Sequence, residues 1–300
     1  MNVDEIMKET NKALDALLGP AFGNAGAGMI PRGSAPAENA GAAVSGRLPA
    51  GSAPAYVAPA YIRPAPAACA APVSLRGQGV NASVPGKLEH SLLDPAITRE
   101  KIIAECNLAG KYGLAAVVVS PYYVECASDI LSRSGVAVCS AAGFPHGAAS
   151  AVAKSAELRE CIRRGASEMD VAVNVLAVKS GETDTARREL QELLQIARGR
   201  CLIKAIYEQS LYNDEEKKIV LSLIRECGCD FVKISNALTG KKAEEADVSF
   251  VRSIVGNKVG IKIDGGVKTL ARTLEILGAG ADRIGMSATI AVAEECLGAG

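Results

Sequence analysis

The sequence has no excess of charge of either sign, because 33 Lys and Arg residues balance 33 Asp and Glu residues along the 300-residue chain. A neutral chain offers no strong field to attract nucleic acid or an anionic membrane. Tryptophan is absent, and the scarce aromatic residues provide little surface for stacking single-stranded bases. No apolar run approaches the roughly 18 residues of a membrane span. These absences argue against nucleic acid and membranes as partners.

The N-terminus also lacks the basic residues of a secretory signal and begins with acidic ones such as Asp4. Nine scattered cysteines favour reduced thiols in the cytoplasm. Cys227 and Cys229 have no second pair with which to bind zinc, and His90 and His146 are far apart in the sequence with no clear third ligand. We therefore expect a cytoplasmic protein that needs no metal or other cofactor.

Proline is concentrated in one stretch, since ten of the 13 prolines fall between Pro20 and Pro85. The rest of this stretch is mostly Ala, Gly and Ser, which cannot bury enough apolar surface to offset the entropy lost on ordering. The composition predicts a disordered linker over residues 20–86.

A short amphipathic helix is predicted before the linker, over residues 1–19, and Gly19-Pro20 is its stop signal. Its polar side carries both acidic and basic residues, which disfavours a membrane-surface helix. Two interpretations remain open: the helix folds back on its own domain, or it docks on another protein. The apolar stripe consists of Val3, Ile6, Met7, Leu14, Leu17 and Leu18.

From Lys87 onward, short β-rich runs alternate with helical segments, which predicts one domain over residues 87–300. Eight strand–helix units are typical of a (β/α)8 barrel, the TIM-barrel form of α/β protein. A doubly wound open sheet is the alternative, but the Gly-rich turn that usually opens it is missing. The predicted strands are 87–89, 115–119, 137–141, 169–173, 202–206, 231–234, 260–263 and 283–285. The predicted helices include 99–112, 148–164, 183–197, 215–227, 247–255 and 269–277.

Four of these apolar strands contain a charged residue: Asp170, Lys204, Lys233 and Lys262. Burial in a barrel interior disfavours the ammonium form of lysine, and a second lysine nearby does the same, so the amine becomes nucleophilic near neutral pH. A neighbouring carboxylate can transfer protons. The pattern favours imine chemistry on a carbonyl compound. Salt bridges that merely satisfy one another are the alternative.

The strands with Asp170, Lys233 and Lys262 lie in three sequence blocks: residues 165–181 (GASEMDVAVNVLAVKSG), 230–233 (DFVK) and 259–269 (VGIKIDGGVKT). Shorter matching blocks occur at residues 92–98, 120–124, 143–147 and 283–287. Over residues 87–298 this order of blocks resembles the deoxyribose-phosphate aldolase family of class I aldolases. The resemblance implies that Lys233 forms the Schiff base, with Lys262 as the neighbour that lowers its pKa and Asp170 as the proton relay. The implied reaction is the reversible, metal-free cleavage of 2-deoxyribose 5-phosphate to acetaldehyde and glyceraldehyde 3-phosphate.

The phosphate side departs from the family pattern. Asp264 precedes the Gly-Gly pair where a small neutral residue is usual, and Met286 interrupts the last small polar block. Backbone N–H groups of four residues are still expected to hold the phosphate, and Asp264 is expected to oppose it if its side chain faces the pocket. These four residues are Gly265, Gly266, Gly285 and Ser287.

Two alternatives to the deoxyribose-phosphate reaction stay open. One is a class I aldolase with a different or unphosphorylated aldehyde acceptor, and the other is a catalytically weak barrel that serves as structural cargo. The segment 1–19 with its linker resembles the encapsulation peptides of bacterial microcompartments, which implies a shell protein as partner. The sequence leaves the oligomeric state open, including a homo-oligomer.

Overall fold

The computed structural model describes residues 83–298 except 237 and 243. The predicted helix at 1–19 and nearly all of the predicted linker lie outside the described residues. The first described residues already pack: Val84 is only 5% exposed and belongs to the hydrophobic core. A 3-10 helix, η2 (Pro85–Lys87), follows it directly. Packed structure therefore begins before residue 87.

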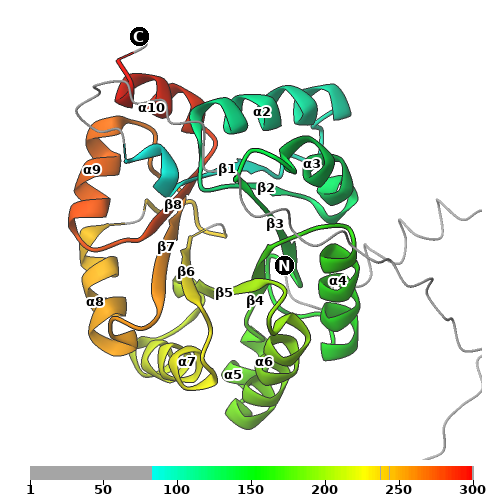
Figure 1. Ribbon diagram of the computed structural model, residues 1–300. Helices are drawn as coiled ribbons and strands as arrows, with labels where there is room; N and C mark the ends of the chain where they lie inside the picture. The colour runs from blue at the N-terminus through cyan, green and yellow to red at the C-terminus, as the bar shows by residue number, and fades with distance from the viewer. Residues whose placement is uncertain (1–82, 237, 243, 299–300) are drawn as a thin grey trace, which may run out of the picture. The chain divides into compact units, whose positions relative to one another are not determined.

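Within the described residues, eight parallel strands close into a barrel in sequence order, with β8 paired to β1 (Figure 1). The predicted (β/α)8 barrel is confirmed. Most strands begin within one residue of the predicted position and run one or two residues further. The strands are β1 (Leu88–Leu92), β2 (Ala116–Val119), β3 (Ala137–Ala142), β4 (Glu168–Ala172), β5 (Leu202–Glu208), β6 (Phe231–Ser235), β7 (Gly260–Asp264) and β8 (Arg283–Met286).

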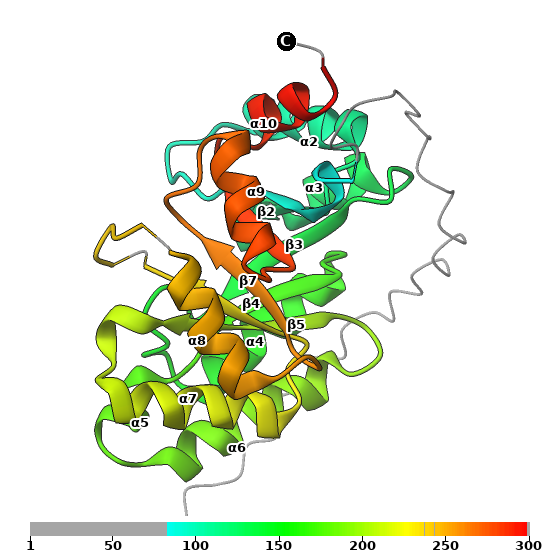
Figure 2. The same ribbon diagram turned by 90° about the vertical axis from the view of Figure 1, so that its left-hand side faces the viewer.

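Helices surround the barrel as an outer layer, which Figures 1 and 2 show from two directions. The last helix lies beside the first one in the described part, where Tyr112 donates a hydrogen bond to Glu294 (2.6 Å). Two predicted ranges, 99–112 and 183–197, match the structure, while α3, α5 and α10 were not among the predicted segments. The helices are α2 (Arg99–Tyr112), α3 (Val124–Leu131), α4 (Ala151–Arg163), α5 (Val175–Lys179), α6 (Thr183–Ala197), α7 (Asp214–Cys227), α8 (Glu245–Val255), α9 (Leu270–Gly278) and α10 (Thr289–Cys296). Short 3-10 helices follow two strands, η3 (Pro121–Tyr123) and η4 (Gln209–Leu211).

Capping residues explain where the helices begin. Thr98 accepts a hydrogen bond from the Lys101 N–H at the start of α2. Asn213 and Glu216 form a reciprocal capping box at the start of α7. α4 begins at Ala151 and not at the predicted 148, because the Ser150 hydroxyl accepts from the backbone one turn on.

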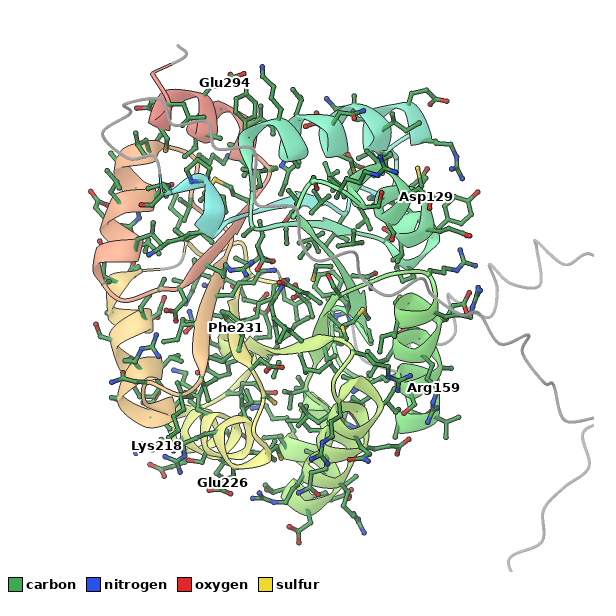
Figure 3. The ribbon with its side chains drawn as sticks, in the orientation of Figure 1. Asp129, Arg159, Lys218, Glu226, Phe231 and Glu294 are labelled. Atoms are coloured by element: carbon green, nitrogen blue, oxygen red, sulfur yellow. The ribbon has the colours of Figure 1, made fainter. Side chains whose placement is uncertain are left out.

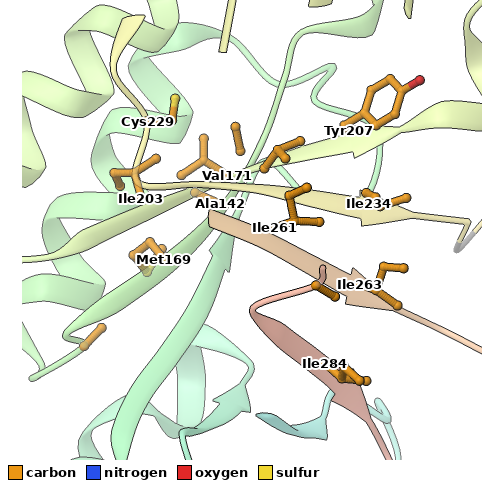
Figure 4. Packing of buried hydrophobic residues seen from close by; sticks show 14 of the residues in the cluster. Ala142, Met169, Val171, Ile203, Tyr207, Cys229, Ile234, Ile261, Ile263 and Ile284 are labelled. Atoms are coloured by element: carbon orange, nitrogen blue, oxygen red, sulfur yellow. The ribbon is translucent and has the colours of Figure 1, made fainter. Parts of the chain in front are cut away.

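The hydrophobic core lies between the barrel and its helices. Strand side chains alternate, so every second residue faces outward, and most of these outward positions are apolar. Figure 4 shows this set around β4 to β8, where Ile261, Ile263 and Ile284 are fully buried. Charged side chains such as Arg159, Lys218 and Glu226 lie on the outside of the helices (Figure 3). No helix in the described residues is long and apolar enough to cross a membrane.

Candidate active site

The inward positions of four neighbouring strands carry charge. Asp170 on β4, Lys204 on β5 and Lys262 on β7 are completely buried, and Lys233 on β6 is 2% exposed. Glu89 on β1 joins them, also fully buried. Alternation along the strands thus places the apolar residues under the helices and the charged residues in the barrel interior.

The three residues predicted to be catalytic lie in direct contact. Lys233 Nζ and Lys262 Nζ each donate a hydrogen bond to Asp170 Oδ2, both at 2.8 Å. The register of β6 and β7 places the two lysines side by side. A second carboxylate, Glu89, accepts from Lys262 at 2.6 Å. The structure therefore places one carboxylate oxygen between two amines.

Lys204 shares Glu89 with Lys262 and pairs in addition with Glu168. Its Nζ lies 2.6 Å from Glu168 and 3.0 Å from Glu89. Lys233 is in register with Ile206, two residues beyond Lys204 on β5, so Lys204 lies one layer nearer to the N-terminal ends of the strands. The salt-bridge interpretation fits Lys204, whereas Lys233 faces the cavity described below.

The expected direction of the pKa shift of Lys233 is wrong. Burial alone lowers the pKa of Lys233, but the carboxylates of Asp170 and Asp264 outweigh burial and the repulsion by Lys262, so its pKa is raised. Burial likewise raises the pKa of Asp170, yet the lysines around it hold that pKa well below its ordinary value. The second carboxylate, Asp264, adds to Asp170 and opposes the effect of the neighbouring lysine. Lys233 is consequently an ammonium ion that must lose a proton before it can attack a carbonyl.

Within the part of the chain that the structure describes, the interior contains one cluster of side chains of the metal-ligand type: Glu89, Cys139 and Asp170. Ammonium groups lie on the carboxylates of this cluster, as described above, and Lys204 Nζ is 3.4 Å from the Cys139 sulfur. The lysines therefore supply the positive charge that these carboxylates need. His90 is turned toward the helices and is hydrogen-bonded to Glu105 of α2 (2.8 Å).

A cavity of about 330 Å³ opens at the C-terminal ends of the strands, and Lys233 lines it. All four residues predicted to hold phosphate line the same cavity: Gly265, Gly266, Gly285 and Ser287. Chemistry in a (β/α)8 barrel is located at this end. A larger cavity of about 720 Å³ lies near the opposite ends of β5 and β6, but none of the interior lysines lines it. The chemistry of the walls, and not the volume, makes the smaller cavity the candidate site.

Several lining residues were missed by sequence reasoning. Phe144 places its ring centroid 5.7 Å from Lys233 Nζ, and Lys241 contributes an exposed ammonium group. Asn236 is 3% exposed, and its side-chain N–H₂ group has no hydrogen-bond partner among the described residues. Asp264 was considered only as an opponent of phosphate, whereas its Oδ2 lies 2.5 Å from Lys233 Nζ. The Gly-Lys-Lys run after β6 was the available signal for Lys241; nothing in the local sequence indicates the partners of Asp264.

The chain is similar to a known family of proteins. The sequence model of the DeoC/LacD family aldolases matches residues 83–292, well over half of the chain. The chain belongs to this family of aldolases. Deoxyribose-phosphate aldolase 1 of Bacillus licheniformis is 38% identical over 205 residues, which cover 68% of this chain and 92% of that protein.

Solved structures lead to the same family. The aldolase QR15 has a TM-score of 0.68 and 32% identity, over 72% of this chain and 96% of that one. The deoxyribose phosphate aldolase of Aeropyrum pernix, described as a tetramer, has a TM-score of 0.66 and 28% identity, over 71% of this chain and 91% of that one. The portion shared with these proteins is the barrel.

Proposed function

We propose that this aldolase reversibly cleaves 2-deoxyribose 5-phosphate to acetaldehyde and glyceraldehyde 3-phosphate through a Schiff base on Lys233. The observation that carries the proposal is the position of Lys233: it is the interior lysine that lines the cavity, and it shares Asp170 Oδ2 with Lys262. The relatives named deoxyribose-phosphate aldolase support the choice of substrate.

The imine makes the carbon–carbon cleavage feasible without a metal. Lys233 attacks C1 of the open-chain sugar and water leaves, which gives an iminium ion. As the C3 hydroxyl loses its proton, the C2–C3 bond breaks and its electrons move toward the iminium nitrogen. Glyceraldehyde 3-phosphate departs, and an enamine remains on Lys233. Protonation at C2 and hydrolysis then release acetaldehyde.

Asp170 and Lys262 are proposed to carry the protons of these steps. Asp170 Oδ2 is within hydrogen-bond distance of both amines, so a proton can pass between Lys233 and Lys262 through one oxygen. Lys262 is raised in pKa because Asp170 and Glu89 outweigh its burial, so it stays positively charged beside the nucleophile. The positive charge of Lys262 favours the neutral amine form of Lys233 when Lys233 no longer pairs with the carboxylates.

The phosphate is proposed to bind at the far wall of the cavity. Gly265 and Gly266 both have positive φ (96° and 82°), a conformation that glycine adopts without strain, so the bare backbone can approach a dianion. Gly285 and Ser287 complete this wall, and Lys241 adds a cation. Asn236 is a suitable donor to a sugar hydroxyl.

Borohydride trapping tests the proposal. Reduction in the presence of acetaldehyde should attach an ethyl group to the peptide that contains Lys233, and Lys233→Ala should abolish both the adduct and turnover. An adduct on Lys262 or Lys204 would assign the Schiff base elsewhere, and no adduct at all would favour the catalytically weak cargo. Comparing phosphorylated with unphosphorylated aldehyde as acceptor separates the deoxyribose-phosphate reaction from the alternative aldolase.

We also propose that residues 1–19 bind a microcompartment shell protein, so that the enzyme acts as cytoplasmic cargo inside the shell. The support is the amphipathic pattern of this segment, its stop signal and the Ala/Pro/Gly-rich stretch that follows. Enclosure would retain acetaldehyde, which is volatile and reactive. A homo-oligomeric barrel is proposed as well, by analogy with the tetramer described for the Aeropyrum pernix protein.

A further inference from the structure

Lys233 is held between two carboxylates. Asp264 Oδ2 lies 2.5 Å from its Nζ, and Asp170 Oδ2 lies 2.8 Å from it. Asp264 is the last residue of β7, two positions beyond Lys262 on the same inward face. The nucleophile thus has one acid on the interior side and another at the mouth of the barrel.

The two carboxylates differ in access and in the number of their partners. Asp170 is fully buried, its Oδ2 accepts from two lysines, and its Oδ1 accepts from the Cys139 thiol (3.4 Å) and lies 3.5 Å from Lys204. The side chain of Asp264 is 20% exposed and lines the cavity, with Lys233 as the ion-pair partner seen among the described residues. A bound aldehyde can therefore reach Asp264, while Asp170 lies beneath Lys233.

The neighbouring strand leaves room for the Asp264 carboxylate. Gly285 on β8 is in register with Asp264. A Cβ at position 285 would lie 2.0 Å from Asp264 Oδ1 and 3.1 Å from Lys262 Cε. Contacts this short cannot be accommodated without movement, so glycine at 285 permits the position in which Asp264 touches Lys233.

We propose that Asp264 is a catalytic residue of this aldolase: it accepts the proton that Lys233 must lose and returns it to the oxygen of the carbinolamine. The proposal rests on the proposed Schiff base at Lys233. Asp264, at the mouth of the cavity, then performs a proton transfer that Asp170 would otherwise have to perform alone.

The protons balance in this scheme. The Lys233 ammonium gives a proton to Asp264, and the neutral amine attacks the aldehyde carbon. The resulting alkoxide takes the proton from Asp264, which gives a neutral hydroxyl group and an ionised carboxylate. The protonated nitrogen then passes a proton to Asp264, which delivers it to the hydroxyl group as the C–O bond breaks. The products are an iminium ion, water and the original Asp264 carboxylate.

Electrostatics around Lys233 agree with this role. The groups that face it are Asp170 on β4, Lys262 and Asp264 on β7, and the Phe144 ring after β3, while Glu89 and Lys204 act through Asp170 and Lys262. Asp170 and Asp264 raise the pKa of Lys233, so an acceptor is needed at neutral pH. Asp170 is a poor acceptor because three lysines depress its pKa. Among the described residues, Asp264 pairs with Lys233 alone.

The decisive measurement is the rate of imine formation with acetaldehyde, followed by rapid quenching in borohydride at several pH values. Asp264→Asn keeps the shape of the side chain and removes its basicity. Its maximal rate across pH should fall by at least about tenfold, within the range that general acid–base catalysis contributes. The acid side of the profile should also move to lower pH, because removal of one carboxylate lowers the pKa of Lys233. Asp264→Ala should show the same loss.

Asp129→Asn is the matched control, since it removes an aspartate from the exposed surface of α3 (Figure 3). Its imine rate should equal that of the unaltered protein, and thermal unfolding should confirm that all variants are folded. An unchanged maximal rate in Asp264→Asn overturns the proposal, even if the profile shifts along the pH axis. A change confined to the KM of the phosphorylated substrate also overturns it and makes Asp264 a phosphate-side residue. If the unaltered protein forms no adduct at Lys233, the proposed function itself fails.

Discussion

At the scale of single residues, two buried lysines on neighbouring strands have different roles. Lys204 and Lys233 both lie on apolar strands and are almost inaccessible, so their sequence surroundings do not distinguish them. The contacts do: Lys204 is surrounded by Glu89, Glu168 and Asp170, whereas Lys233 reaches the cavity. Lys204 is therefore a stabilising residue, because it neutralises carboxylates that cannot reach water.

Replacement of Lys204 should accordingly lower the stability of the barrel. Lys204→Met removes the nearer of the two cations that Glu89 and Glu168 share, since Arg283 lies 3.5 Å from each of them. The free energy of unfolding should fall by about 3–5 kcal/mol. Urea unfolding at neutral pH measures this loss. Below the melting temperature, the variant should still form its borohydride adduct at Lys233.

Lys218→Met provides the control for that experiment. Lys218 pairs with Glu215 on the exposed side of α7, and such a pair contributes at most about 1 kcal/mol. If both variants lose equally little stability, the interior ion pairs do not stabilise the barrel.

At the scale of elements, the segment between β3 and α4 depends on close contact with the end of β4. Gly147 has a φ of 66°, and a Cβ there would lie 2.0 Å from the Val173 carbonyl oxygen. The same segment carries Phe144, whose ring lies over Lys233. Its position therefore affects both the fold and the cavity wall.

Two glycine substitutions distinguish the cost of the steric contact at Gly147 from the cost of a left-handed backbone conformation. Gly181 also has a positive φ (74°), but a Cβ there would meet nothing within 4 Å. Gly181→Ala should cost only the left-handed strain of about 1–2 kcal/mol. Gly147→Ala should lose a further 1 kcal/mol or more, roughly the cost of overpacking, and should also slow turnover. Equal unfolding free energies for the two variants would show that the segment between β3 and α4 can move away from the end of β4 without loss of stability.

At the scale of the whole molecule, the barrel should act independently of the N-terminal segment. The described residues complete a closed barrel with its cavity, and Val84 is already part of the core. Deletion of residues 1–82 should leave kcat and KM unchanged in a steady-state assay. We place the boundary before Val84, because a longer deletion would remove a buried side chain.

The second arm of this experiment tests the targeting proposal directly. Residues 1–19 fused to a fluorescent protein should sediment with microcompartment shells, and Leu14→Glu with Leu17→Glu should prevent this by placing charge on the apolar stripe. Aggregation or inactivity of the truncated barrel would instead mean that the segment belongs to the barrel's own fold.

The sequence alone determined the barrel and showed which strands carry charge, because both depend on local pattern. Alternation of strands and helices specifies the repeat, and a charged residue in an apolar strand indicates the barrel interior. Helix boundaries such as that of α4 shifted by a few residues, since a cap depends on one side chain and its backbone partner. Packing likewise begins at Val84 and not at the predicted residue 87, and α8 begins at Glu245 and not at the predicted 247.

Only the tertiary structure decided which of the interior charges meet. Asp170, Lys233 and Asp264 come from three different strands, and the stagger of the closed barrel determines their distances. A sequence pattern shows that each residue points inward, but it does not show that Asp264 lies against Lys233 or that Gly285 leaves room for it. The sign of the Lys233 pKa shift depends on that contact, because the sum of nearby charges and burial is a property of three-dimensional distance.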